Sequence, residues 1–479
     1  MIKGVTLNLQ RSNDGSERIR SMNRQYRVSR RQFLSTGATA GFMIPASRLF
    51  GQAVSAPPSG QFRFAKVGCG GMGNGDLNST TGVGGVVVGL CDTDAKRAEG
   101  AFKKYPDVPK FTDYRKMLDR LEKEIDGVVI STPDHTHACI ALDAMRRGKH
   151  VYVQKPLART YEECRLLLEA AREYKVVTQM GNQGHAGAGL ILWKKMMDAG
   201  AFGEIEQVHT WSDRPIWPQG MTKPPAPEKT PDGFDWECWI GPAAMLPFSS
   251  AYAPFKWRGW WDFGCGAIGD MACHNMDPAF WILQLGMPTS IKAQASAPAG
   301  IAYPEWSIIE FTFPATPVCP QGVKVTWYDG KKLPARPANA HPQLNLGGNG
   351  CMVVGSKMTA MGGSHAAPPM PIALGKEAYS PAVKEAERLW REELKQTKGC
   401  NHYGQWVEAC KAHDLKKPGS NFEYSVPMTQ VLLLGCIALR FPGVELKWDA
   451  RNARFTNHAE ANRWLASTQR DGFKLEAKQ

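Results

Sequence analysis

The sequence lacks the runs and spacings that mark several classes of protein. One late apolar stretch, MTQVLLLGCIALRF, has only fourteen residues, so we expect a buried helix and no membrane span. The twelve cysteines are scattered, without a CxxC pair or a Cys/His spacing typical of zinc, and we expect neither a disulfide framework nor a bound metal. Because no internal repeat, low-complexity tract or basic run interleaved with aromatics is present, we also expect no nucleic-acid partner.

Length and charge indicate two folded domains behind a basic leader. With 479 residues and 43% hydrophobic content, the chain can bury sizeable cores. The formal charge of +13 is concentrated in residues 1–56, which carry nine Lys/Arg against two Asp/Glu. The rest of the chain has 49 Lys/Arg against 43 Asp/Glu, a net charge of +6. This excess is too small to indicate a polyanion partner.

The basic leader contains a motif for export. The stretch VSRRQFLSTGATAGFMIP holds Arg30 and Arg31 before a small, mildly apolar run, which matches a twin-arginine signal. We therefore expect residues 1–56 to be a leader and the protein to be periplasmic or otherwise exported. An ordinary basic N-terminus is the alternative. Cleavage near Ala53 or elsewhere, and retention as a membrane anchor, are both left open; membrane contact is expected only through export or an uncleaved leader.

The stretch FRFAKVGCGGMGNGDL predicts a dinucleotide-binding turn. An alternating apolar strand runs into Gly68, Gly70 and Gly73 at the G-x-G-x-x-G spacing. The first glycine permits a tight turn, the second lets the backbone approach a pyrophosphate, and the third lets the helix pack on the strand. We expect Gly71 and Met72, between them, to contact the cofactor as well.

A second apolar stretch, GVVVGLCDTD, strengthens this interpretation. It ends in Asp92, which lies 24 residues after Gly68. An acidic side chain at this place accepts hydrogen bonds from both adenosine ribose hydroxyls and repels a 2′-phosphate, so NAD is favoured over NADP. A plain strand-turn-helix unit with a solvated aspartate is the alternative reading.

Strand-like and helix-like stretches then alternate up to residue 186. This alternation predicts an α/β Rossmann domain over residues 61–186, with ligands at the carboxyl ends of its parallel strands. The residues at such ends are Thr132, Pro133, His135, Gln154 and Lys155. From sequence alone, Lys155 fits equally well as a solvated loop charge and as a hydrogen-bond donor or proton-transfer group beside a nicotinamide.

Residues 187–479 predict a second, α+β domain. Strand-like stretches and a glycine-rich hairpin follow a proline-rich loop, and the last helices are candidates to pack on the first domain. Within this half, GDMACHNMD places Asp270 and His274 four residues apart, either as one turn of a packed helix or as a carboxylate and an imidazole aimed at one substrate. Pro278 predicts a kink or restart there, with Asp277 a candidate N-cap.

Aromatic and polar side chains near these motifs are candidates for substrate binding. Eight of the fifteen tryptophans lie between residues 193 and 261, and we expect more than half of them to pack in the core. The substrate candidates are Trp260, Trp261 and Arg258 before the Asp270 motif, and Asn182, Gln183 and His185 at a strand end.

Taken together, KVGCGGMG, CDTD, STPDHTH, VQKPLA and GDMACHNMDPAFW resemble the glucose-fructose oxidoreductase / inositol dehydrogenase (Gfo/Idh/MocA) family of nicotinamide-dependent sugar oxidoreductases. Members have an N-terminal Rossmann domain and a C-terminal α+β domain, whose open, mostly antiparallel sheet often forms oligomer contacts. The resemblance therefore implies this fold, a small carbohydrate substrate and a homo-oligomer, either a dimer or a tetramer.

The resemblance also implies roles for particular residues. The family's E-K-P signature appears as Gln154-Lys155-Pro156, with the lysine that approaches substrate and nicotinamide at Lys155. The effect of Gln154 in place of the usual glutamate is left open. In relatives, the residue at His274 takes the hydroxyl proton, and the residue at Asp270 hydrogen-bonds the sugar.

We therefore expect an NAD(P)-dependent oxidoreductase acting on a sugar, polyol or glycoside, with His274 as base and hydride transfer to nicotinamide. An exported enzyme has no obvious pool of free NAD, so the cofactor should be tightly bound and recycled. That consideration keeps a redox-neutral NAD-dependent glycoside hydrolase or lyase as an alternative. A non-catalytic nucleotide- or sugar-binding protein on the same fold is a further alternative from another class.

Overall fold

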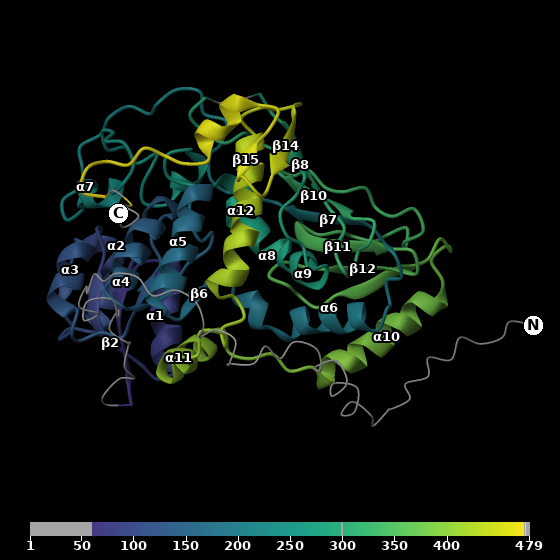
Figure 1. The fold of residues 1–479 in the computed structure, drawn as a ribbon, viewed down its shortest axis with the longest axis horizontal. Helices are drawn as coiled ribbons and strands as arrows, with labels where there is room; N and C mark the ends of the chain where they lie inside the picture. Colours follow the sequence, from purple (N-terminus) through teal and green to yellow (C-terminus); the bar gives the residue numbers. More distant parts are fainter. Residues whose placement is uncertain (1–59, 298–299, 474, 476–479) are drawn as a thin grey trace, which may run out of the picture. The chain divides into compact units, whose positions relative to one another are not determined.

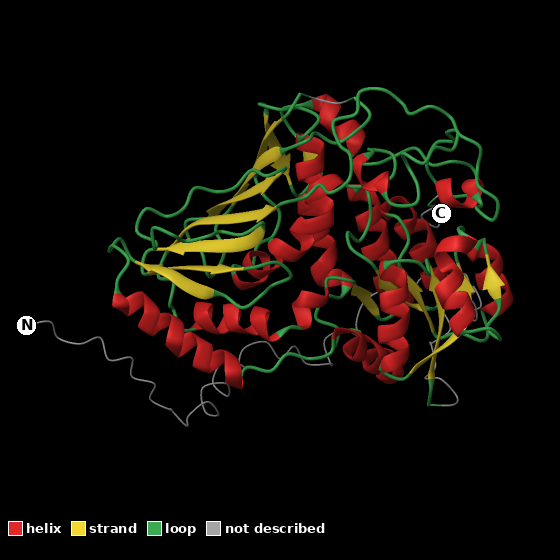
Figure 2. Cartoon of the chain, turned by 180° about the vertical axis from the view of Figure 1, so that it is seen from behind, coloured by secondary structure: helices red, strands yellow, loops and turns green. Residues whose placement is uncertain are grey.

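The computed structural model describes residues 60–297, 300–473 and 475. The predicted twin-arginine motif at Arg30 and Arg31 lies outside these residues. The described residues form an α/β Rossmann domain followed by an α+β domain with a second sheet, as the sequence predicts (Figures 1 and 2).

The Rossmann domain is built on a six-stranded parallel sheet with the order β3-β2-β1-β4-β5-β6. Its strands are β1 (Phe62–Val67), β2 (Gly85–Cys91), β3 (Lys110–Phe111), β4 (Gly127–Ile130), β5 (His150–Val153) and β6 (Thr178–Met180). Its helices are α1 (Met72–Gly82), α2 (Ala95–Lys104), α3 (Tyr114–Leu121), the turn η1 (Asp134–Thr136), α4 (His137–Arg146) and α5 (Tyr161–Tyr174). The strand order reverses between β1 and β4, and such a switch point is where these sheets bind ligands.

Local sequence explains these elements. The strands GVVI and HVYV of β4 and β5 are buried at every position, as expected for parallel strands covered on both faces. Helix α5 begins with a capping box, in which Thr160 and Glu163 each bind the other's backbone N–H. This cap fixes the chain direction just after the QKP segment.

The second domain contains a nine-stranded sheet with the order β13-β12-β11-β7-β10-β9-β8-β14-β15, in which only the β7–β10 pair is parallel among the described strands. Its strands are β7 (Ile205–Ser212), β8 (Ser290–Ala295), β9 (Ser307–Phe313), β10 (Val323–Asp329), β11 (Asn349–Gly355), β12 (Met358–Gly362), β13 (Met370–Leu374), β14 (Glu445–Asp449) and β15 (Arg454–Phe455).

Helices and 3-10 turns complete this half of the chain. They are η2 (Gln183–Ala186), α6 (Ala188–Asp198), α7 (Trp236–Ile240), η3 (Lys256–Gly259), α8 (Gly266–Asn275), α9 (Asp277–Ile282), α10 (Pro381–Gln396), α11 (His402–Ala412), α12 (Phe422–Ala438) and η4 (Ala459–Trp464). Helix α8 lies against β7, β10 and β11, so the predicted Asp/His helix packs directly on the sheet.

Two late helices connect the second half to the Rossmann domain. On α11, Trp406 packs edge-on against Phe62 of β1, with ring centroids 5.0 Å apart. Helix α12 contacts both α5 and α8 and runs between the two sheets in Figure 1. Its apolar residues are buried on all sides, which explains its hydrophobic sequence. Among the described residues, no helix combines the length and apolarity needed to cross a bilayer.

The chain restarts its helix near Pro278, as the sequence predicts. Helix α8 ends at Asn275 and α9 begins at Asp277. The expectation that Asp277 is the N-cap is wrong, because Met276 occupies that position. The Asp277 carboxylate instead contacts the imidazole of His185 at 3.0 Å, an interaction between segments far apart in sequence.

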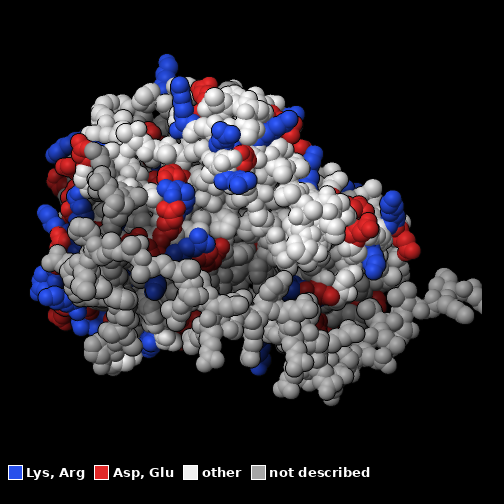
Figure 3. All heavy atoms as spheres, in the orientation of Figure 1, with Lys and Arg blue, Asp and Glu red and all other residues white. Residues whose placement is uncertain are grey.

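The cysteines are free thiols in the described residues, and the face drawn in Figure 3 carries charges of both signs. All twelve cysteines lie in the described residues as free thiols, and ten are buried, which confirms that most are core residues. No group of three His, Cys, Asp or Glu side chains in the described part of the chain is placed to hold a metal ion. On the face drawn in Figure 3, Lys and Arg are interspersed with Asp and Glu.

Candidate active site

A cavity of about 440 Å³ lies at the carboxyl ends of the Rossmann strands and extends to α8 of the second domain. It brings together most of the residues that the sequence singles out. Those in its lining are Gly68, Gly70, Gly71, Met72, Gly73, Asp92, Thr132, Pro133, Gln154, Lys155, Gln183, Arg258 and His274.

Two glycines of the turn between β1 and α1, Gly68 and Gly73, have no room for a side chain. Gly68 has a φ of +79°, and a Cβ there would lie 2.4 Å from the carbonyl oxygen of Ser131. A Cβ on Gly73 would lie 2.1 Å from the carbonyl oxygen of Gly68. Close backbone packing therefore requires glycine at both positions. The turn lines the cavity at the start of α1, and a helix N-terminus favours phosphate. This geometry fits the pyrophosphate of a dinucleotide.

Asp92 and Arg97 lie together at one end of this turn. The Asp92 carboxylate accepts the backbone N–H groups of Cys69 at 2.7 Å and Asp94 at 3.0 Å. Burial nevertheless raises the pKa of Asp92. Arg97, which sequence reasoning missed, lies so close to Gly71 that a Cβ there would be 2.9 Å from its Nη2. The site thus offers an acceptor for ribose hydroxyls and, beside it, a cation.

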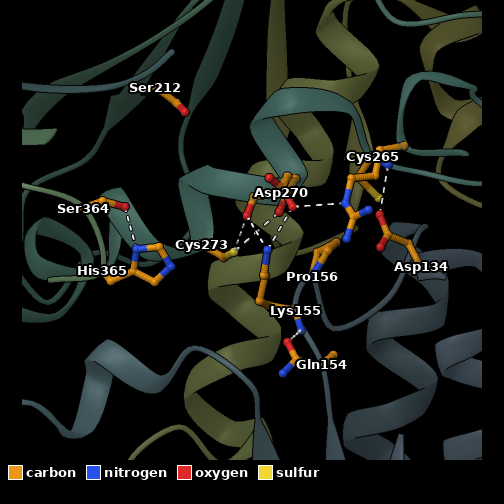
Figure 4. A network of polar contacts seen from close by, with 12 residues as sticks. Asp134, Gln154, Lys155, Pro156, Ser212, Cys265, Asp270, Cys273, Ser364 and His365 are labelled. Atoms are coloured by element: carbon orange, nitrogen blue, oxygen red, sulfur yellow. Dashed lines mark hydrogen bonds and ion pairs between the residues drawn. The ribbon is translucent and has the colours of Figure 1, made fainter. Parts of the chain in front are cut away.

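Lys155, Asp270 and Arg258 form an ion cluster in the site. Figure 4 shows the contact between Lys155 and Asp270. Lys155 Nζ donates to both Asp270 Oδ1 and the Asp270 backbone oxygen at 2.9 Å, and Arg258 Nε donates to Oδ1 at 3.2 Å. Burial alone would raise the pKa of the Asp270 carboxyl, but the two cations lower it below its usual value. The carboxylate is therefore ionised at neutral pH and holds Lys155 in place.

His274 lies one helical turn after Asp270 and stacks on His365, with ring centroids 3.9 Å apart. Burial lowers the pKa of His274 well below its usual value, so the imidazole is neutral at pH 7. Its Nδ1 is buried and has no hydrogen-bond partner among the described residues. His365, from the loop after β12, also lines the cavity, and its Nδ1 contacts Ser364 Oγ at 2.7 Å.

Gln154 is part of a buried polar network. Its Nε2 donates to both carboxylate oxygens of Asp76, at 3.0 and 2.9 Å, while its Oε1 accepts the backbone N–H of Lys155 at 3.2 Å. Tyr403 from α11 donates to the same carboxylate at 2.7 Å. An acidic side chain at position 154 would face Asp76 without a donor. The network therefore accounts for an amide at position 154.

Asp134 lines the cavity, whereas its neighbour His135 does not. His135 is buried and binds the backbone oxygen of Trp239 through Nε2 at 2.9 Å. Asp134 accepts the backbone N–H of Cys265 at 3.1 Å, and burial raises the pKa of its carboxyl to about 7. The STPDHTH motif points to this segment, but the sequence does not show which of its polar side chains faces the cavity.

Asn182 and His185 are also outside the cavity lining, unlike Gln183 between them. Asn182 donates to the Asp277 carboxylate at 3.2 Å, and His185 contacts the same carboxylate. Both side chains thus tie η2 to the start of α9.

Trp260 and Trp261 do not line this cavity. Trp260 is buried and donates to the backbone oxygen of Ala251 at 2.9 Å. Trp261 faces a second cavity. The aromatic residues in the lining of the first cavity are instead Tyr114, Phe234, Trp239, Phe255, Trp257 and Phe473.

Two family models match the chain at this fold and site. Residues 62–182 match the oxidoreductase family's NAD-binding Rossmann fold, and residues 194–319 match its C-terminal alpha/beta domain. The chain therefore belongs to the Gfo/Idh/MocA oxidoreductase family.

Individual relatives cover only part of the chain. Inositol 2-dehydrogenase from Salmonella paratyphi B is 32% identical over 149 residues, which are 30% of this chain and 43% of that protein. A glycosyl hydrolase family 109 protein from Solibacter usitatus is 32% identical over 197 residues, 37% of this chain and 44% of that protein. The chain thus matches less than half the length of these curated relatives.

Solved structures extend the likeness in fold over most of the chain. The WlbA dehydrogenase from Chromobacterium violaceum, in complex with NADH and UDP-GlcNAcA, superposes with a TM-score of 0.58 at 17% identity, covering 83% of this chain and 99% of that one. Levoglucosan dehydrogenase in complex with NADH has a TM-score of 0.53 at 17% identity, covering 81% and 99%. At such low identity the likeness establishes the fold alone.

Proposed function

We propose that this protein is an NAD(P)-dependent oxidoreductase that oxidises a hydroxyl-bearing carbon of a sugar, polyol or glycoside. The observation that carries the proposal is one cavity lined by the glycine turn, Lys155 and His274, with Asp270 bound to the lysine. A cofactor cradle, a positioned cation and an unprotonated imidazole are the groups that carbinol oxidation requires.

Lys155 and His274 have different roles in this reaction. Two of the three N–H donors of the Lys155 ammonium bind Asp270, which leaves the third to donate to the substrate oxygen. Neutral His274 accepts the hydroxyl proton as the carbonyl forms, and its unpartnered Nδ1 gains a partner if the substrate binds there. Bound NAD(P) supplies the acceptor for the hydride that leaves the same carbon.

The test combines cofactor release with an absorbance assay. We also propose that the protein is exported by the twin-arginine route and therefore retains its cofactor, so denatured protein should release NAD or NADP, detected by mass spectrometry. In the assay, cofactor is added to the protein together with myo-inositol, glucose or levoglucosan. An increase in absorbance at 340 nm then reports reduction of the cofactor. His274→Ala should abolish turnover but still bind cofactor, while His341→Ala, outside the cavity lining, should behave as the parent. Full activity of His274→Ala would contradict the role of His274 as the base.

Redox-neutral glycoside cleavage is the second candidate, and the similarity to the family 109 glycosyl hydrolase favours it. In this reaction, oxidation, elimination, addition of water and reduction occur in one cycle, so the cofactor ends in its starting state. Aryl glycosides would then release the phenol without a net change at 340 nm. A stoichiometric rise at 340 nm would exclude this candidate and support net oxidation.

A further inference from the structure

A second cavity, of about 290 Å³, lies beside the C-terminal half of α12 and shares no lining residue with the active-site cavity among the described residues. Its walls come from the start of α5, the end of α12, the loop at Trp261 and the segment from η4 onward. Three arginines line it, Arg159, Arg440 and Arg463, with Asp262 the single carboxylate among the described lining residues.

Arg440 makes cation–π contacts with two tryptophan rings at this cavity. Its guanidinium carbon Cζ lies over the rings of Trp261 and Trp464, 3.9 and 3.5 Å from their centroids. Contacts with ring faces do not use the guanidinium N–H donors, and these donors can bind carboxylate or phosphate with two parallel hydrogen bonds. No ion pair within the described residues uses this guanidinium. Burial, with Arg159 nearby, lowers the pKa of Arg440 to about 10.

Two further polar groups at this cavity also lack partners. Arg159 donates from Nη1 to the Trp261 backbone oxygen at 3.1 Å, but its buried Nε has no partner among the described residues. The buried hydroxyl of Ser467, in the same lining, has none there either. Buried donors left unsatisfied are unfavourable, and two like-charged arginines around one cavity repel each other.

We propose that this cavity binds a small oxyanion, a carboxylate or phosphate group of a metabolite, through Arg440 and Arg159. One anion would satisfy the Arg440 fork and the free donors while relieving the repulsion between the two cations. The cavity is large enough to hold more than the anionic group alone. The proposal does not depend on the function of the first cavity, since the two linings are separate.

Calorimetric titration of the full chain tests this site. The probes are inorganic phosphate and D-glucuronate at constant ionic strength, with neutral D-glucose as the comparison; the two anions distinguish a phosphate from a carboxylate ligand. We expect at least one anion to bind the parent. Arg440→Gln should weaken its binding about tenfold or more, because charge-assisted bidentate bonds are lost. Arg336→Gln, an exposed arginine outside the lining, should bind as the parent does.

A second pair of variants covers the case in which Arg440→Gln does not fold. Arg440→Lys keeps a positive charge but loses the planar fork, and Arg159→Gln removes the second cation; each should weaken binding of the same anion. Tryptophan fluorescence of the parent should change on titration, since Trp261 and Trp464 contact the guanidinium. Failure of both anions to bind the parent, or unchanged affinity in these variants, would overturn the proposal.

Discussion

Gln154 donates its side-chain amide to both carboxylate oxygens of Asp76, at 3.0 and 2.9 Å, while its own carbonyl accepts the backbone N–H of Lys155. The side chain before the active-site lysine is therefore fixed by a carboxylate on α1. The carboxylate of this pair thus belongs to Asp76, which contacts the side chain immediately before Lys155.

Gln154→Glu should destabilise the protein by roughly 2–4 kcal/mol at pH 8, because it replaces a buried donor with a second carboxylate facing Asp76. Lowering the pH should reduce the loss, since protonation of the introduced carboxyl restores a donor to Asp76. Urea denaturation at pH 8 and pH 5 measures both effects.

The rescue variant makes this prediction specific. Combining Gln154→Glu with Asp76→Asn returns one amide and one carboxylate to the pair, and should recover most of the lost stability. A double-mutant cycle of unfolding free energies then gives the interaction free energy between positions 76 and 154. Equal destabilisation with and without Asp76→Asn would contradict a direct contact between the side chains.

Lys155→Met should lower turnover by about 10²–10⁴-fold, the range typical for loss of a proton-handling group, while leaving cofactor binding intact. Arg258 remains to hold the Asp270 carboxylate, so the fold should persist. The measurement is kcat and cofactor affinity on the substrate found in the 340 nm screen. Loss of cofactor binding together with activity would instead indicate collapse of the cavity.

The site residues that follow a strand end or share a helical turn can be predicted from the sequence. The glycine turn, Asp92 and Lys155 follow strands whose ends meet at one edge of a parallel sheet, so their convergence is predictable. The pairing of Asp270 with His274 follows from one helical turn. These groups needed only periodicity and family spacing to be placed together.

The remaining groups arrive through tertiary packing that no local pattern encodes. Tyr403 binds Asp76 across 327 residues of sequence, and His365 reaches His274 from a loop after β12. Similarly, Trp257 of η3 lines the cavity, whereas Trp260, which directly follows η3, does not. A tryptophan-rich loop has no regular periodicity that would predict which of its rings faces the cavity.

Asp134→Asn should change the pH dependence of stability. Burial raises the pKa of this carboxyl from 3.8 to about 7. Between about pH 4 and pH 7, Asp134 is ionised in the unfolded chain but protonated in the folded protein, so wild-type protein loses stability as the pH rises through this range. The variant lacks this loss and should be more stable than wild type at pH 8, by up to about 4 kcal/mol, but not at pH 4. A pH-independent difference in urea denaturation would contradict it.

Asp92 and Arg97 should set the choice between NAD and NADP in opposite directions. We expect wild-type protein to bind NAD more tightly, because the Asp92 carboxylate accepts ribose hydroxyls and repels a 2′-phosphate. Asp92→Asn removes the repulsion while Arg97 remains beside the turn, so the NADP:NAD affinity ratio should rise by roughly tenfold or more. Adding Arg97→Ala should cancel that rise, since it removes the cation available to the phosphate. Titration of each variant with both cofactors gives the ratios, and a rise that persists without Arg97 would show that this arginine does not contact the phosphate.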